Sequence, residues 1–226
     1  MAKTKLHRLG WLALPILLSG CGGSTSSGTI KIRAMDASAG ESSVNISAGA
    51  NIIMSGGTYG NVTGYQTIAQ TGSQLFLLTG STGATLSDPT FDLQANSFYT
   101  AYATGPSTSP GLLLVSEDHS NPGAKVRINL VNLSAAVGNV DVYVTAPGAS
   151  LATSTPITTG LAFQSPFTTL VAPGSYEVRF TNAGAQTVVG DQTVGALTAG
   201  AIVRYVLIDS SSGAAPQSIT SLTDSG

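Results

Sequence analysis

The sequence predicts an all-β protein in which two tandem antiparallel β-sandwich domains follow an N-terminal export signal. Three observations support this prediction. Apolar residues recur with period two in segments of about four to eight residues, Gly, Pro, Asn or Ser separates these segments, and similar segments return about 100 residues later. No stretch after residue 21 has the pattern of a helix longer than a turn or two.

The first element is the export signal at residues 1–20. Lys3, Lys5 and Arg8 precede an apolar stretch from Leu9 to Leu18, which is the order of a secretory signal peptide. A membrane-spanning helix needs roughly 20 apolar residues, so this stretch is too short to be an uncleaved anchor.

The end of the signal is typical of a bacterial lipoprotein. Leu18, Ser19 and Gly20 form the expected recognition sequence for the signal peptidase, and Cys21 becomes the first residue of the mature chain. Cys21 is the only cysteine, so it has no internal disulfide partner, and acylation of its thiol is the favoured interpretation. Two or three acyl chains such as palmitate would hold the protein stably on a membrane. No other cofactor is expected.

The composition of the mature chain limits its possible partners and the kind of surface it can have. Without residues 1–20 it has 206 residues and six Lys+Arg against eleven Asp+Glu, a net charge of −5, which disfavours nucleic-acid binding. Charged residues make up only 9% of the whole sequence, so hydroxyl and amide side chains must cover much of the surface. The run Gly22–Gly28 completes a tether at residues 21–28.

The strands that follow show clear alternation. Tyr176–Phe180 places Tyr, Val and Phe on one side and Glu and Arg on the other, and Val140–Val144 and Ala201–Val206 have the same pattern. Turn signals every 8 to 12 residues favour immunoglobulin-like or Greek-key sandwiches. A single sixteen-strand barrel is the alternative, but it lacks the expected longer segments and aromatic girdles.

The segments also form two series with a slowly growing offset. Asp36–Ser38 aligns with Asn132–Ser134 at 96 residues, Tyr65 with Phe167 at 102, and Phe98 with Ile202 at 104. Loop insertions in a duplicated domain produce such growth. The predicted domains are residues 29–118 and 124–226, joined by a linker at 119–123 that contains Asn-Pro-Gly.

These repeated segments resemble the bacterial exported family known as domain of unknown function 4397, which often occurs in tandem. The resemblance rests on Val140–Val144, Leu161–Phe163, Ala172–Val178 and Leu197–Gly200 in the second copy, and more weakly on Ile32–Ser38 in the first. It implies a β-domain of the cell envelope. It brings no established activity and no catalytic residues.

Few residues could support chemistry. Glu117, Asp118 and His119 form the densest polar cluster, but neighbouring strand residues point to opposite faces, so a solvated domain junction is favoured over a metal site. Asp88 and Asp92 are interpreted as turn and exposed strand positions rather than a glycosidase pair. No Gly-x-Ser-x-Gly elbow occurs. No catalytic and no metal-binding residue is therefore predicted.

Tyr59 and Tyr65 flank a glycine-containing loop and are the candidate ligand contacts, although a packing role is favoured for both. The expected function is a non-enzymatic structural, adhesive or protein-interaction role at the cell envelope. In a Gram-negative cell Gly22 favours the outer membrane, facing the periplasm or the surface. Polysaccharide binding is the alternative, with glycans instead of envelope proteins as partners, and a hydrolase is the remote one.

Overall fold

Strands make up most of the part of the chain that the structure describes. The computed structural model describes residues 28–215 and 217–222, and the predicted signal peptide and Cys21 lie outside this part. The all-β prediction is confirmed, since the only helical element in the described residues is a short 3-10 turn, η1 (Leu151–Thr153). No helix in residues 28–215 and 217–222 has the length and apolarity needed to cross a membrane.

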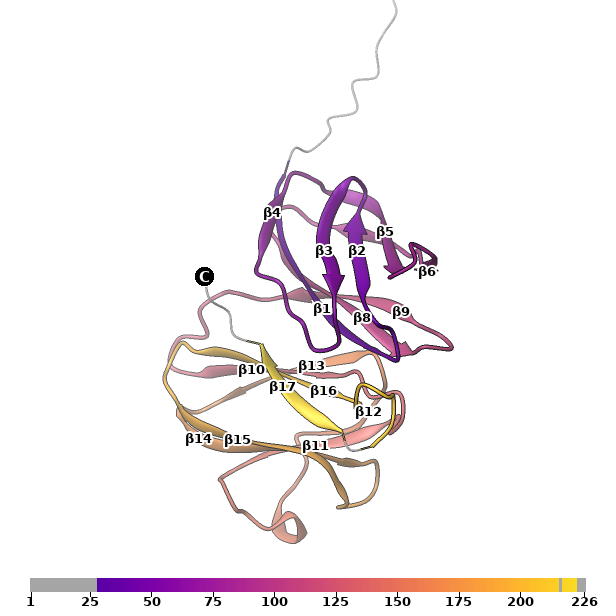
Figure 1. The fold of residues 1–226 in the computed structure, drawn as a ribbon. Helices are drawn as coiled ribbons and strands as arrows, with labels where there is room; N and C mark the ends of the chain where they lie inside the picture. The colour runs from indigo at the N-terminus through magenta and orange to yellow at the C-terminus, as the bar shows by residue number, and fades with distance from the viewer. Residues whose placement is uncertain (1–27, 216, 223–226) are drawn as a thin grey trace, which may run out of the picture.

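The first half of the chain forms a sandwich of two sheets (Figure 1). One sheet has the order β4-β1-β8-β9, with bounds Gln66–Ile68, Ile30–Ala39, Phe98–Pro106 and Gly111–Glu117. The other has the order β3-β2-β5-β6, with bounds Asn51–Gly57, Val44–Ala48, Gly72–Gly80 and Thr85–Ser87, and β7 (Thr90–Leu93) also pairs with β5.

The second half repeats this arrangement. One sheet has the order β13-β10-β16-β17, with bounds Ser165–Val171, Val126–Asn132, Ile202–Ile208 and Ser218–Leu222. The other has the order β12-β11-β14-β15, with bounds Thr158–Leu161, Val140–Thr145, Gly174–Asn182 and Val188–Leu197. The chain passes between the halves over residues 118–125, and the finer domain boundaries stay predictions.

Strand registers match between the halves. Lys31 lies opposite Phe98 in the first half. Arg127, 96 residues after Lys31, lies opposite Ile202, 104 residues after Phe98, so both predicted offsets are reproduced. The predicted alignment of Tyr65 with Phe167 is wrong by one residue. Gln66 lies opposite Ile32 in the first half, and the offset of 102 would place residue 168 opposite Ile128, but Thr169 lies there instead. The segment before β13 is therefore one residue longer than the offset of 102 implies.

One strand pair in each sandwich departs from the antiparallel prediction. β1 and β8 are parallel, as are β10 and β16, whereas all the other pairs between named strands are antiparallel. The first strand of each sandwich thus lies beside its second-to-last strand in one sheet. Parallel neighbours need a long crossover, and the whole second sheet of each sandwich serves as that crossover.

Each sandwich has its own core between its two sheets. The first includes Ile32, Ile46 and Phe76, and the second includes Ile128, Val142 and Phe180, all of them fully buried. These residues occupy one face of alternating strands, as period-two patterning requires.

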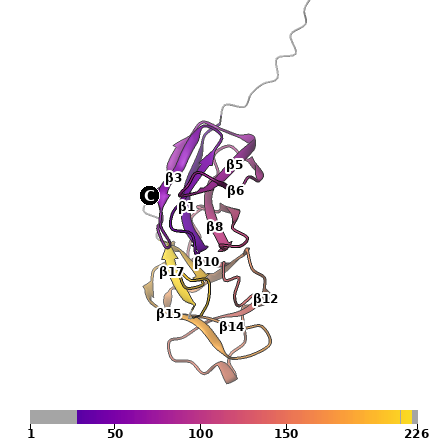
Figure 2. The ribbon, with the colours of Figure 1, turned by 45° about the vertical axis from the view of Figure 1, so that its right-hand side comes forward.

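A third core joins the sandwiches. It consists of buried side chains from both halves: Met35, Ala37, Tyr102, Val115, Val131, Leu133, Val206, Ile208 and Leu222. They project from the opposite face of β1, β8, β9, β10, β16 and β17, so the two sheets that contain these strands pack against each other at the centre of the molecule (Figures 1 and 2). Every residue of β10 is consequently buried, which is typical of a strand covered on both faces.

Candidate functional site

Polar residues line the same central interface at one end of the third core. Arg33 on β1 lies opposite Thr100 on β8, and Asn129 on β10 lies opposite Arg204 on β16. Because Arg33 and Asn129 are equivalent by the offset of 96, the two rows are matching positions of the two sandwiches. All four side chains are buried.

Glu117, the last residue of β9, is the centre of this cluster. Its carboxylate is fully buried and lies 2.9 Å from Nη2 of Arg204 and 3.5 Å from Nη2 of Arg33. The hydroxyls of Thr100 and Tyr65 donate hydrogen bonds to it. Arg204 belongs to the second sandwich and the other groups to the first, so this ion pair crosses between the sandwiches.

The electrostatics of Glu117 favour a permanent carboxylate. Burial by itself raises the pKa, but the hydrogen bond with His119 and the charges of Arg204 and Arg33 outweigh it and lower the pKa to about 2. A carboxylate with so low a pKa is a poor general base near neutral pH, because it holds a proton too weakly. Removal of one partner from such a buried pair typically costs about 3–5 kcal/mol.

Aromatic rings close the outer side of the cluster. The His119 ring stacks on Phe98 with centroids 3.9 Å apart, and its Nε2 lies 3.0 Å from the Glu117 carboxylate. The Tyr65 ring meets both rings edge-on, and the Arg33 guanidinium lies 4.6 Å from its centroid. The cluster is thus packed rather than open.

The expected solvated junction is wrong for Glu117 and correct for Asp118. Alternation along the strand turns Asp118 outward, where its side chain is 59% exposed and pairs with Arg127 at 2.8 Å. Glu117 points inward, and the second sandwich covers it. Alternation correctly assigned the two residues to opposite faces, but it could not show that both faces of this sheet are covered.

A second polar bridge lies at the other end of the interface. The Tyr59 hydroxyl donates to the backbone carbonyl of Asp209, and the amide of Gly40 donates to the carbonyl of Ser211 at 2.9 Å. Burial, with the nearby charge of Asp209, raises the pKa of Tyr59 to about 12. The Asp209 carboxylate in turn accepts a hydrogen bond from Ser134.

Tyr59 and Tyr65, the candidate ligand contacts, are therefore both placed at the interface between the sandwiches. Each is half-buried, and each hydroxyl donates to an acceptor of the protein itself. This geometry supports the packing role, while ligand contact stays a prediction. Asp92 is exposed on β7, as expected, and Asp88 is exposed in the segment between β6 and β7, where the structure has no turn.

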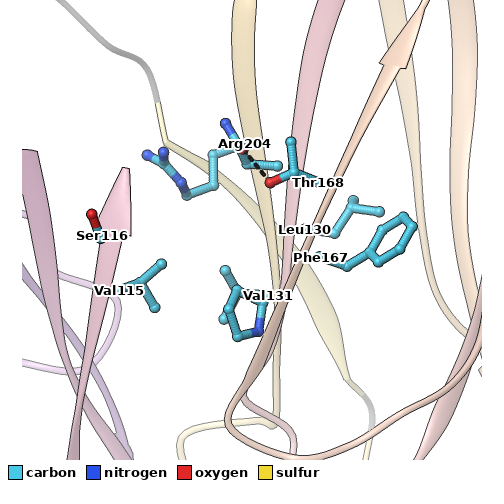
Figure 3. A pocket seen from close by; sticks show the side chains of 9 residues that line it. Val115, Ser116, Leu130, Val131, Phe167, Thr168 and Arg204 are labelled. Carbon is cyan, nitrogen blue, oxygen red and sulfur yellow. Dashed lines mark hydrogen bonds between the residues drawn. The ribbon is translucent and has the colours of Figure 1, made fainter. Parts of the chain in front are cut away.

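Two small grooves flank the polar cluster. One, of about 270 Å³, is lined by Arg33, Tyr65 and the 62–64 loop together with Ser221 and Leu222. The other, of about 140 Å³, lies where Val115 and Ser116 of β9 face Val131 and Arg204 of the second sandwich (Figure 3). Both are seams between the sandwiches. Within residues 28–215 and 217–222, no three His, Cys, Asp or Glu residues are grouped so as to hold a metal ion.

The residues that sequence reasoning missed are Arg33, Thr100 and Arg204. The signal was the position of two arginines at the centre of strongly apolar strands, Ile32-Arg33-Ala34 and Val203-Arg204-Tyr205. In a chain with few cations, such placement is compatible with a buried ion pair as well as with a solvent face, because arginines are fully buried only when they are paired.

The fold and this site define a β-protein of two sandwiches whose densest polar cluster forms ion pairs across the interface between them. Residues 30–143, just over half of the chain, match the family described as domain of unknown function (DUF4397). The chain belongs to this family. The match begins with β1 and ends within β11.

Other comparisons add little. A comparison with curated proteins gives no match. One of the solved structures that match is described as alpha-glucan binding by a streptococcal virulence factor. It is 10% identical, the alignment covers 78% of this chain and 92% of that chain, and the TM-score is 0.27. A similarity this low carries no argument about function.

Proposed function

We propose that this protein is a lipid-anchored, non-enzymatic module of the bacterial cell envelope, which holds a rigid pair of β-sandwiches at a membrane for contacts with other envelope proteins. The observation that carries the proposal is the sequence Leu18-Ser19-Gly20-Cys21 behind a basic and apolar leader. The thiol of Cys21, the chain's single cysteine, would carry the acyl chains.

The geometry of the polar cluster supports a non-enzymatic role. Glu117 and His119 would be the natural base candidates, yet both carboxylate oxygens of Glu117 accept hydrogen bonds and the His119 ring is stacked on Phe98. The cluster stabilises the interface, and no step of bond making or breaking follows from it.

We also propose that residues 124–226 are a second copy of the family domain. Matching strand order supports this, as do equal registers such as Val44 opposite Gly80 and Val140 opposite Asn182. A duplicated domain docked on itself makes a longer rigid body. Exposed edge strands such as β15 offer backbone groups to a partner strand.

Mass spectrometry of the protein purified from membranes tests the anchor. The N-terminal peptide should begin at Cys21 and carry two or three acyl chains, and a Cys21→Ser variant should keep its leader and lack the acyl mass. An unmodified thiol at Cys21 in protein released into the medium would contradict the proposal.

Affinity capture from solubilised envelope tests the partner. A specific envelope protein should be retained by the intact protein and lost when the edge of β15 is blocked by Val188→Pro, with Asp118→Asn as the matched surface control. Saturable binding on a glycan array that is abolished by Tyr65→Ala, without loss of folding, would instead favour the polysaccharide alternative.

A further inference from the structure

The first sandwich has one end at which the described chain begins. Thr29 precedes β1 there, and its carbonyl accepts a hydrogen bond from Asn96 at 2.8 Å. The turn between β2 and β3 lies at the same end, on the side away from the second sandwich (Figure 1). In that turn the amide of Gly49 donates to the carbonyl of Leu75 at 2.9 Å.

This end carries the two most exposed large apolar side chains of the first sandwich. Ile52 is 65% exposed and Leu75 is 53% exposed. Ser47 lies opposite both Ile52 and Leu77, so these residues share the outer face of the sheet, and Leu75 joins them two positions before Leu77. We call Ile52, Leu75 and Leu77 the N-terminal apolar patch.

The charged side chains near the patch do not favour a partner that binds by electrostatic attraction. Asp92 lies opposite Ser73 on the same face and is exposed, while Lys31 is on the other sheet with its Nζ 5.3 Å from the Phe98 ring centroid. An acidic side chain beside an apolar patch does not favour a purely electrostatic partner. Burial of apolar surface is the interaction that the patch offers.

The chain length before Thr29 selects the partner. Eight peptide units separate Cys21 from Thr29, and a fully extended chain of that length reaches at most about 29 Å. With acyl chains on Cys21, the end that carries the patch is confined to a thin layer above the lipid. Tethering at such short range gives an effective concentration on the order of millimolar, at which a small patch is enough for contact.

We propose that the N-terminal apolar patch rests on the membrane surface, with Ile52 and Leu75 inserted among the lipid headgroups and the second sandwich directed away from the membrane. This inference rests on the proposed lipid anchor. The partner is the lipid surface itself, and the contact is apolar, so it should persist on zwitterionic lipid and in high salt.

Tryptophan fluorescence provides the test, because the only tryptophan, Trp11, lies in the leader that maturation removes. The variants are Ile52→Trp and Leu75→Trp, with Val188→Trp as the control. Val188 is 41% exposed on β15, in the sheet of the second sandwich that lies farther from the first (Figure 1). Each lipidated protein is reconstituted into phosphatidylcholine vesicles with and without brominated acyl chains, and thermal unfolding confirms that each variant is folded.

Brominated lipid should quench the emission of the Ile52→Trp and Leu75→Trp variants roughly twofold, as expected for side chains about 5–10 Å into the interface, and leave the control nearly unchanged. Equal quenching in all three variants, or none in any, with acyl chains verified on Cys21 by mass spectrometry, would overturn the membrane contact alone. An unacylated Cys21 would overturn the proposed function and this inference with it.

Discussion

Replacement of Asp36 by asparagine should stabilise the protein. Asp36 lies on β1 with no exposed surface, and its Oδ1 accepts hydrogen bonds from the backbone amide and the hydroxyl of Ser38 at 2.9 and 2.6 Å. Its Oδ2 is buried and has no hydrogen-bond partner among the described residues. Burial raises the pKa of this carboxyl above its usual range.

The second sandwich shows what the position favours. Asn132 occupies the equivalent place and repeats the contact with Ser134 through Oδ1, at 3.0 Å. Its Nδ2 donates to the carbonyls of Gly138 at 2.7 Å and Leu161 at 3.0 Å. Val44 lies opposite Gly57 just as Val140 lies opposite Leu161, so Gly57 is the equivalent of Leu161 in the first sandwich. The side-chain amide of an asparagine at position 36 would therefore find the carbonyl of Gly57 as its acceptor.

The magnitude follows from the orphaned oxygen. A buried polar atom without a partner costs about 1–3 kcal/mol, and Asp36→Asn should recover that amount at neutral pH. Because the pKa of Asp36 is raised in the folded state, the folded protein binds the proton more tightly than the unfolded chain does. Stability from this group is therefore fully present below the unfolded value of 3.8 and lost as pH rises through the folded pKa.

Urea unfolding at pH 4 and pH 7 measures both effects. The gain from Asp36→Asn should be larger at pH 7 than at pH 4. The reverse change, Asn132→Asp, should destabilise the protein at pH 7, since it sets a carboxylate against two carbonyls. A loss of stability in Asp36→Asn, or a gain that is the same at both pH values, would refute this reasoning.

Three further predictions concern the interface. Arg204→Ala should lower the free energy of unfolding by about 3 kcal/mol, since it leaves Arg33, at 3.5 Å, as the only arginine beside the buried Glu117 carboxylate. Asp118→Asn at the exposed pair should cost less than about 1 kcal/mol, and equal effects of the two changes in urea unfolding would contradict the buried pair. The pKa of Glu117 is lowered to about 2, so the stability that its carboxylate contributes is complete above the ordinary value of 4.5 and lost as pH falls through about 2. Glu117→Gln should therefore remove most of the change in the free energy of unfolding between these two pH values. Tyr59→Phe removes the hydrogen bond to Asp209 and should cost about 1 kcal/mol by thermal unfolding; an unchanged stability would mean that this bond contributes nothing to docking.

Much of the fold could be predicted because its determinants are local. Alternation in Tyr176–Phe180 and Val140–Val144 identified two strands, now β14 and β11, that pair with each other. Offsets of 96 and 104 residues matched the registers of β1 with β8 and of β10 with β16. A period-two pattern is fixed by the backbone itself, so it survives in the sequence.

The candidate site could not be predicted in the same way, because it depends on a contact between two sheets. Arg204 alternates with apolar neighbours and has the pattern of a solvent-facing residue, yet it is only 2% exposed. Its partner Glu117 is 87 residues away in the sequence, on the other sandwich. Alternation assigns a residue to a face of a sheet and does not show what covers that face.

Scanning calorimetry of the mature protein tests most directly whether the buried cluster and the third core join the two sandwiches into one body. The unaltered protein should show a single transition whose calorimetric and van't Hoff enthalpies agree, and replacement of Arg204 by alanine should divide it into two transitions. Two separate transitions in the unaltered protein would show that the sandwiches unfold independently, and would contradict the architectural role assigned to Glu117 and its partners.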